Sequence, residues 1–187
     1  MKYFLIGRNG TGKKYLAKKL AESGFKVTTA YDPSDMLIEI SDIIIATPKT
    51  ALQIAKTMSD TAFHIIYLTA DLEERLKHIP EKSPEKENKF YKQHIDENQM
   101  FSDFEKNVLT KDGFANYTNI TAYLVINNDY ENTFDDTIQH VKNTFMLHNT
   151  LCDIVSMLVN TGTLTSKTKG KISVYVSDKN GEEKTIE

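Results

Sequence analysis

The sequence predicts an α/β fold in which a five-stranded parallel sheet lies between two layers of helices, with a small β-hairpin near the carboxyl end. Five short apolar runs alternate with longer amphipathic stretches. That alternation is typical of strands buried on both faces and connected by covering helices. The chain has 187 residues, of which 40% are hydrophobic and 26% charged. This length and composition fit one globular domain with an appendage.

The five apolar runs are the predicted strands. They are rich in β-branched and aromatic residues, and most meet a Gly, Pro, Asp or Asn within a few positions. Such residues favour strands that end in loops at the carboxyl edge of a sheet. The runs are Tyr3–Ile6, Phe25–Thr29, Ile43–Thr47, Phe63–Leu68 and Ala122–Ile126.

The stretches between the runs repeat apolar residues at helical spacing. Gly24 is a suitable C-cap for the first helix, and Pro48 stands where a helix start tolerates proline. Asp71 and Glu74 form an Asp-x-x-Glu start, which favours a helix N-terminus. The predicted helices are Lys13–Ser23, Pro48–Met58, Asp71–Ile79, Asn88–Leu109 and Thr133–Val159, the last of which is equally compatible with two helices.

Two segments lack apolar periodicity. The stretch Ile79–Asn88, IPEKSPEKEN, has two prolines and dense charge, and it predicts a mobile surface loop. We expect one domain over residues 1–160, followed by a linker and β-hairpin over 161–187 with its turn at Asn180-Gly181. The exposed edges of that hairpin can pair with a second copy to give a homodimer, and a hairpin that folds back on itself is an equal alternative.

Composition excludes several classes of partner. The net charge of -3 and the pI near 6.0 give no basic surface of the kind that binds nucleic acid. Cys152 is the only cysteine and the five histidines share no spacing, so we expect neither an internal disulfide nor a metal-ligand set, and we expect a reducing, cytoplasmic setting. No run approaches about 18 apolar residues, so no membrane span or signal peptide is expected.

The chemistry is indicated by the loop after the first strand, GRNGTGKK. Two glycines separated by four residues and followed by lysine, between a strand and a helix, are typical of a P-loop, or Walker A motif. The glycines let backbone amides wrap around a phosphate, while the helix N-terminus and the lysine supply positive charge. A glycine-rich turn that only connects a strand to a helix is the structural alternative. The residues expected to bind a nucleotide are Gly7, Arg8, Asn9, Gly10, Thr11, Gly12, Lys13 and Lys14.

Lys14 departs from the usual motif. It occupies the position of a Ser or Thr whose hydroxyl ligates Mg²⁺ in a P-loop. An ammonium repels a cation, although it can neutralise phosphate charge. We therefore expect ATP or a related nucleotide as the ligand, with Mg²⁺ lacking its usual ligands.

Beyond this motif, residues 1–147 resemble the guanylate-kinase-like members of the nucleoside monophosphate kinases, a group of P-loop proteins. The resemblance implies a three-layer P-loop fold with sheet order 2-3-1-4-5, in which a nucleotide-kinase-like domain over 1–160 carries a lid region at about 76–110. It also implies transfer of the γ-phosphoryl group of ATP to a nucleoside monophosphate. Three stretches carry the resemblance, in the family's order: FLIGRNGTGKKYLAKKL, DIIIATPKTALQIAKTMSDTAFHIIYLTADLEERLKH and YLVINNDYENTFDDTIQHV.

The resemblance assigns roles to single residues. Lys13 and Arg75 are the implied catalytic residues, the first on the β and γ phosphates and the second at the start of the lid, where relatives contact the transferring phosphate. Lys77 and Lys92 fall where relatives often have further arginines. The implied phosphate-binding residues are Gly7, Asn9, Gly10, Thr11, Gly12 and Lys13. The implied contacts to the donor base are Asn127, Asn128 and Asp129.

Three departures from the family bear on activity. Only AYDPSDMLIEIS separates the second and third strands, which is too short for the family's acceptor-binding subdomain. The third strand ends at Ala46-Thr47-Pro48, without the acidic residue that supports Mg²⁺ in relatives. The chain has two arginines, Arg8 and Arg75, against 21 lysines, whereas phosphoryl transfer relies on bidentate arginine clamps.

Two functions therefore stay open. One is an ATP-dependent kinase of a small acceptor such as a nucleoside monophosphate. The other is a nucleotide-binding module that has lost catalysis and acts through protein partners. A weaker possibility besides these two is a loop that holds only an inorganic anion. Arg75 is equally compatible with a solvated helix residue paired with Asp71. Asp32 and Asp35 fit local capping better than contacts to an acceptor or to a metal-bound water.

Overall fold

The computed structural model describes residues 1–78, 83–110, 117, 119–131, 133–160, 174–177 and 183–186. It divides into two compact units, Met1–Lys142 and Asn143–Glu187. The first unit contains the sheet and the glycine loop. In the second, β6 (Val174–Ser177) and β7 (Glu183–Ile186) pair antiparallel, as predicted for the C-terminal hairpin, while the Asn180-Gly181 turn lies outside the described residues.

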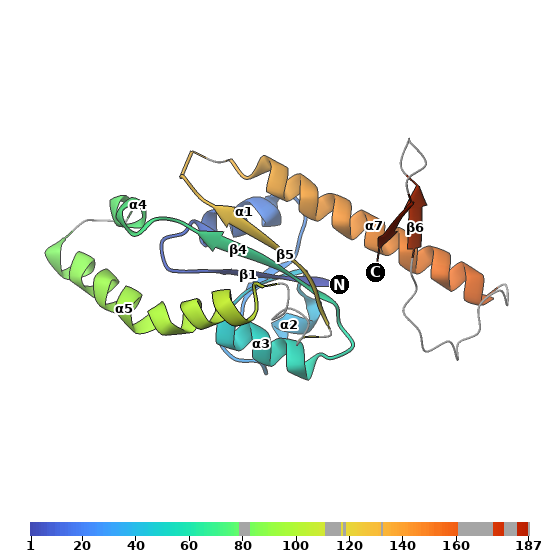
Figure 1. Ribbon diagram of the computed structural model, residues 1–187, viewed down its shortest axis with the longest axis horizontal. Coiled ribbons are helices and arrows are strands. Elements are labelled where there is room, and N and C mark those ends of the chain that lie inside the picture. Colours follow the sequence, from blue (N-terminus) through green and yellow to red (C-terminus); the bar gives the residue numbers. More distant parts are fainter. Residues whose placement is uncertain are drawn as a thin grey trace. The chain divides into compact units, whose positions relative to one another are not determined.

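The first unit is built on a five-stranded, fully parallel sheet with the order β2-β3-β1-β4-β5, which confirms the predicted order (Figure 1). Phe4 of β1 lies opposite Ile44 of β3 and Ile65 of β4. Because all strands run the same way, the loops at their carboxyl ends open at one edge of the sheet. The strands are β1 (Lys2–Gly7), β2 (Val27–Thr29), β3 (Ile43–Ile45), β4 (Phe63–Thr69) and β5 (Ile120–Asn127).

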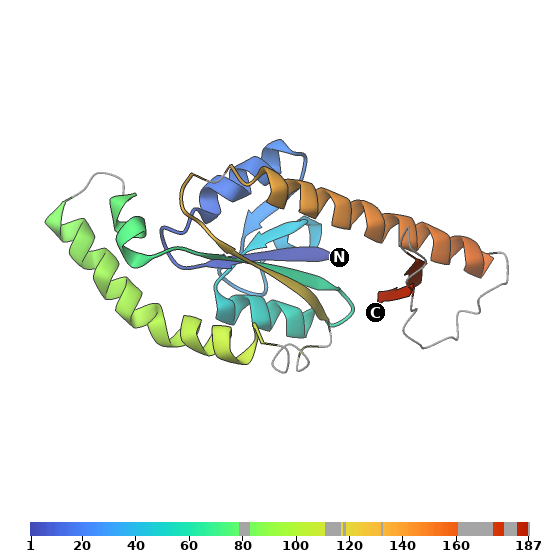
Figure 2. The same ribbon diagram turned by 45° about the horizontal axis from the view of Figure 1, so that its top comes forward.

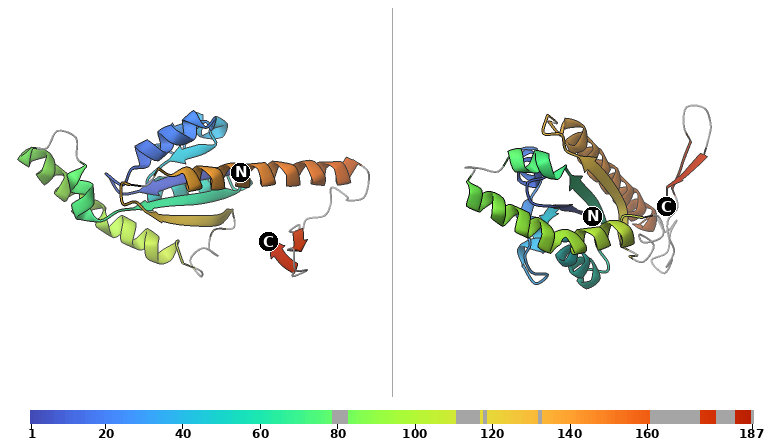
Figure 3. Two further views of the ribbon diagram at one scale, coloured as in Figure 1. Left: turned by 90° about the horizontal axis from the view of Figure 1, so that it is seen from above. Right: turned by 60° about the vertical axis from the view of Figure 1, so that its left-hand side comes forward.

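Helices cover both faces of this sheet, which confirms the three-layer prediction (Figure 2). On one face lie α1 (Lys13–Glu22) and the first turns of α7 (Asp135–Asn160). On the other lie α3 (Pro48–Thr57) and α5 (Pro84–Asn107), which contact each other (Figure 3). Two short helices, α2 (Leu37–Ile40) and α4 (Leu72–Lys77), follow β2 and β4.

Every residue of β1 after Lys2 is buried, so its alternating side chains enter both interior layers. Phe4 and Ile6 are fully buried and belong to the core that also contains Ile54 of α3 and Phe104 of α5. Phe4 stacks on Phe63 with ring centroids 4.4 Å apart. Burial of a single such aromatic side chain contributes about 2 to 3 kcal/mol, so the strand that precedes the glycine loop is firmly anchored on both sides.

The predicted helix ends are right where local capping decides them. Gly24 adopts a φ of +95°, and its N–H donates to Ala21 at 3.0 Å in the loop that ends α1. Pro48 opens α3 behind Thr47, whose hydroxyl accepts from the amide of Thr50 at 3.2 Å. Residues 135–160 form one helix, which resolves the alternative left open for that stretch.

The predicted loop over Ile79–Asn88 is wrong in its second half. Ser83 accepts a hydrogen bond from the amide of Lys86 at 3.3 Å, and Pro84 occupies the first helical position, so α5 begins there. A Ser-Pro pair is itself a helix-start signal, but the dense charge around it suggested a loop. Residues 79–82 lie outside the described part. None of the described helices is both long and apolar enough to span a membrane.

Candidate functional site

The glycine loop lies between β1 and α1, at the carboxyl edge of the sheet. Gly10 and Gly12 adopt φ angles of +82° and +89°, a region that favours glycine. A Cβ on Gly7 would lie 2.5 Å from the carbonyl oxygen of Leu68 on β4. The loop conformation therefore requires glycine at these three positions, for backbone angle at two and for close packing at the third.

Lys13 places its ammonium inside the loop. Its Nζ donates to the carbonyl oxygens of Gly7 at 2.5 Å and Arg8 at 2.6 Å. Burial lowers the pKa of Lys13 to about 8, with Arg75 and Lys14 lowering it further and Glu97 opposing them. The amides of Lys13 and Lys14, in the first turn of α1, make no hydrogen bond within the described part of the chain. A poorly solvated ammonium and a helix N-terminus together favour a bound anion.

The loop offers Mg²⁺ few ligands. Lys14 is exposed at the position where a hydroxyl would be needed, and the Thr11 hydroxyl donates to the carbonyl oxygen of Arg8 at 2.9 Å. Thr47, at the end of β3, caps α3 instead. Among the described residues no group of three or more His, Cys, Asp or Glu side chains could hold a metal ion. The donor groups of the described residues therefore do not fit a magnesium site of the usual P-loop kind.

Asn128 supports the loop from the end of β5. Its side chain is 4% exposed, and its Nδ2 donates to the carbonyl oxygen of Thr11 at 3.1 Å. Its Oδ1 accepts from the amide of Tyr130 at 3.0 Å. A Cβ on Gly12 would lie 2.6 Å from that Nδ2. The side-chain amide of Asn128 therefore connects the glycine loop to the segment that follows β5.

Two residues after β5 have backbone conformations that are rare for non-glycine residues. Tyr130 has a φ of 65° and Phe134 a φ of 61°. The Tyr130 hydroxyl donates to the carbonyl oxygen of Gly10 at 2.5 Å, and Phe134 is buried near Gly12 and Tyr15. Such strain persists only where surrounding contacts impose it, so the segment after β5 is fitted to the glycine loop.

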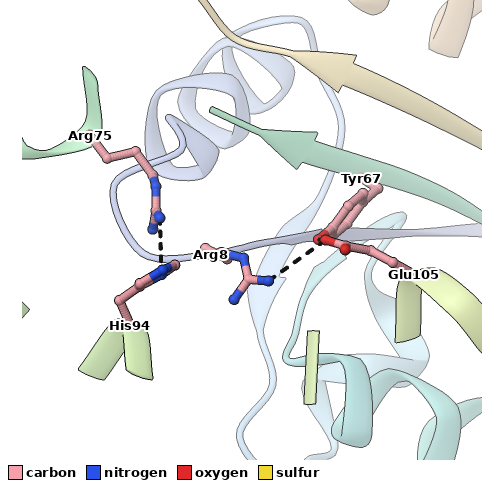
Figure 4. A network of polar contacts seen from close by, with 5 residues as sticks. All are labelled: Arg8, Tyr67, Arg75, His94 and Glu105. Atoms are coloured by element: carbon pink, nitrogen blue, oxygen red, sulfur yellow. Dashed lines mark hydrogen bonds and ion pairs between the residues drawn. The ribbon is translucent and has the colours of Figure 1, made fainter. Parts of the chain in front are cut away.

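Arg75 lies buried against the same loop, with 2% exposure. Its Nη1 donates to the carbonyl oxygen of Asn9 at 3.1 Å and its Nη2 to Nδ1 of His94 at 3.1 Å (Figure 4). A guanidinium cannot accept, so His94 accepts with Nδ1 and is neutral there. The alternative of a solvated Arg75 paired with Asp71 is wrong, because the side chain is turned to the loop. Asp71 is the N-cap residue of α4, but its side chain makes no capping hydrogen bond.

Burial affects the ionisable groups at and around Arg75. Desolvation lowers the pKa of His94, and the nearby positive charges of Arg75 and Arg8 lower it further. The Nε of Arg75 is buried without a hydrogen-bond partner in the described part of the chain. The guanidinium also lies over the ring of Phe90 at 5.5 Å. It thus keeps an unused donor beside the glycine loop.

Arg8 turns its side chain from the loop toward α5. Its guanidinium lies 3.8 Å from the carboxylate of Glu105 and 4.7 Å above the ring of Phe101, and the Tyr67 hydroxyl donates to the same carboxylate (Figure 4). Burial and the hydrogen bond to Glu105 raise the pKa of Tyr67. The two arginines thus attach the loop to α4 and α5.

Two cavities flank the loop. The larger, of about 430 Å³, is lined by the cations Arg75, Lys86 and Lys89 and by Gly10 and Phe90, among others. The smaller, of about 240 Å³, lies at the carboxyl ends of β1, β2 and β3. Asn9 and Gln93 line both cavities, and a 3.1 Å hydrogen bond from Asn9 Nδ2 to Gln93 Oε1 joins them. This hydrogen bond between the glycine loop and α5 therefore lies at the boundary of both cavities.

The remaining predicted residues lie around the site. Asn127 and Asp129 line a third cavity of about 400 Å³, together with the acidic Asp71 and Glu74. Lys77 is exposed and bonds to Glu74 at 2.5 Å. Lys92 is exposed on α5. The carboxylates of Asp32 and Asp35 accept the local amides of Ser34 and Leu37 at 2.8 and 2.9 Å, whereas the N-cap residue of α2 is Met36, without a side-chain capping bond.

Several residues that face the loop were not identified from the sequence. They fall at positions i, i+3, i+4 and i+7 of α5, a pattern that puts them on one helix face, which continues to the buried Phe101 and Phe104. That periodicity was the available signal, although it could not show which part of the chain the face meets. The residues are Phe90, Gln93, His94 and Glu97.

The fold can be set beside known proteins. No protein-family model and no curated protein matches the chain. Similar solved structures include an uncharacterized protein from Eubacterium ventriosum, with a TM-score of 0.45 and 16% identity over 76% of this chain and 99% of that one. They also include a shikimate kinase from Bacteroides thetaiotaomicron, with a TM-score of 0.39 and 11% identity over 78% of this chain and 98% of that one. The chain's own strand order and the glycine loop between β1 and α1 give it a P-loop kinase-like α/β fold, without singling out the guanylate-kinase-like group.

Proposed function

We propose that this chain binds ATP or a related nucleoside triphosphate at residues 7–14 and transfers its terminal phosphoryl group to a small acceptor. The observation that carries the proposal is the convergence of three positive groups on one glycine loop: the Lys13 ammonium, the N-terminus of α1 and the buried Arg75 guanidinium. A phosphate offers Lys13 a stronger, charge-assisted partner than the two carbonyl oxygens that it now contacts. Positive groups fixed in a poorly solvated site stabilise the charge that develops during phosphoryl transfer.

The larger cavity supports a nucleotide rather than a phosphate alone. Three cations line it, which suits a polyanionic chain of phosphates. His78, also part of its lining, stacks on Tyr130 with ring centroids 3.8 Å apart and an interplanar angle of 13°. Planar rings of this kind provide a surface on which a base can pack. The proposed donor nucleotide thus lies between the loop and α5.

Isothermal titration calorimetry with ATP tests the binding step. Lys13→Ala should weaken ATP binding by about 10- to 100-fold, since a hydrogen bond to a charged group is worth about 1.5 to 3 kcal/mol. Lys18→Ala is the matched control, because Lys18 lies on the same helix, is exposed and forms a 3.8 Å ion pair with Glu22. Equal affinities of the two variants, or no ATP binding by the wild type, would reject the proposed site.

A second candidate is a nucleotide-binding module without catalysis that acts through protein partners. Lys14 favours it, because an exposed ammonium stands where P-loop enzymes hold a metal ligand. Under this alternative, the wild type binds ATP but forms no ADP, and Lys14→Thr raises Mg²⁺-dependent binding. ADP formation by the wild type above that of Lys13→Ala would exclude it.

A further inference from the structure

Glu97 is a carboxylate at the glycine loop that the phosphate-binding motif does not include. It lies on α5, is partly buried, and lines the smaller cavity together with Lys13. Gln93, one turn earlier, donates from Nε2 to Glu97 Oε1 at 2.8 Å and accepts from Asn9 Nδ2 at 3.1 Å. The loop therefore orients Gln93, and Gln93 orients the carboxylate.

The smaller cavity has the chemistry of a site for hydroxyl groups. Of its lining residues only Lys13 and Glu97 carry a charge, while Thr29, Tyr31 and Thr47 contribute hydroxyls. Its volume of about 240 Å³ is below the range of about 300 to 1,000 Å³ that is common for drug-sized ligands. It therefore suits a compact molecule that forms hydrogen bonds.

Neither arginine lines this cavity. Arg8 extends to Glu105, and Arg75 contacts Asn9 and His94 (Figure 4). An acceptor that carries its own phosphate calls for cationic partners, among which bidentate arginines bind most specifically. Among the described residues Lys13 is the one cation in the lining, and under the proposed function it binds the donor phosphates. The cavity therefore disfavours a nucleoside monophosphate.

We propose that Glu97 is the general base of the transfer and that the acceptor is a compact hydroxyl compound without a phosphate group. The Glu97 carboxylate takes the hydroxyl proton while the acceptor oxygen bonds to the γ-phosphorus. The bond from that phosphorus to the β–γ bridging oxygen breaks, ADP leaves, and Glu97 returns the proton to solvent. This inference rests on the proposed function, which supplies the ATP.

The test measures ADP formation by the full chain with ATP and Mg²⁺, first with water as the only acceptor and then with sugars, polyols or nucleoside monophosphates. A positioned general base contributes about 10²- to 10⁴-fold, so Glu97→Gln should lower the rate at least 100-fold while its ATP affinity by calorimetry stays unchanged. Asp96→Asn is the matched control, since Asp96 is the adjacent carboxylate, is exposed and lies outside this cavity. The rate of the wild type should fall in acid, and the Gln variant should lack that dependence.

The outcomes separate this inference from the function on which it rests. Failure of the wild type to bind ATP rejects the proposed function itself. Normal ATP binding without turnover by the wild type rejects the transfer step of the proposed function, and the inference with it. Normal ATP binding together with an unchanged rate for Glu97→Gln, or with preferred transfer to a nucleoside monophosphate, overturns the inference alone. So does rescue of the Gln variant by excess Mg²⁺, which would make Glu97 a metal ligand. Stimulation by a sugar or polyol that depends on Glu97 supports it.

Discussion

Replacing Asn128 by alanine should loosen the glycine loop at its base. The side chain is 4% exposed and makes hydrogen bonds of 3.1 Å to the Thr11 carbonyl and 3.0 Å from the Tyr130 amide. Each bond contributes about 1 kcal/mol, and the groups left unpaired add to the loss, so the free energy of unfolding should fall by about 3 kcal/mol. For a chain of this size that corresponds to a decrease in Tm of about 6 to 12 °C.

Thermal and urea unfolding followed by circular dichroism measure this change, and Asn127→Ala is its control. Asn127 is the adjacent residue of the same chemistry, but it is exposed and its Oδ1 accepts only a 3.4 Å hydrogen bond from the Thr69 hydroxyl. Its replacement should change stability by less than about 0.5 kcal/mol. A loss below about 1 kcal/mol for Asn128→Ala, or equal losses for both variants, would refute the role of Asn128 as a support of the loop.

Three further predictions concern backbone and charge. Gly24→Ala should lower the free energy of unfolding by about 1 to 2 kcal/mol through its positive φ alone, because a Cβ there meets nothing within 4 Å. Gly12→Ala should lower it further, because its Cβ also meets Asn128 at 2.6 Å. Equal losses for the two variants in urea unfolding would contradict this. Burial sets the pKa of Lys13 at about 8 and bound phosphate raises it, so ATP binding at about pH 8.5 should take up protons, and affinity should weaken as the pH rises. Calorimetry in two buffers of different ionisation enthalpy measures that uptake, which Lys13→Arg should abolish. Because the pKa of His94 is lowered in the folded state, the unfolded chain binds more protons just below pH 6.5. The free energy of unfolding should therefore fall as the pH drops through that window, and it should fall less for His94→Gln. Identical pH dependences of the two stabilities would contradict the role of His94.

The glycine loop and most of the helices and strands could be predicted from residues that are close together in the sequence. Apolar runs, the Gly24 cap and the Pro48 start act within a few positions of the chain, so their pattern predicts strands and helix ends directly. The Ser83-Pro84 start of α5 is the same kind of local signal, but the charged residues around it are also typical of a surface loop. The segment after β5 was indicated by the family resemblance instead, which did not distinguish the buried Asn128 from its exposed neighbours.

By itself, the sequence determined the glycine loop, the number of strands in the parallel sheet and the layered class of the fold, because periodicity and turn chemistry depend on adjacent residues. Only the tertiary structure decided what meets that loop. Asn128 lies 117 residues from Thr11, Arg75 lies 66 from Asn9, and Gln93 lies 84 from Asn9. These contacts depend on how the parallel strands order themselves and on where α5 crosses the carboxyl edge of the sheet. That long-range geometry buries Arg75, turns Arg8 toward Glu105 and brings Glu97 beside Lys13.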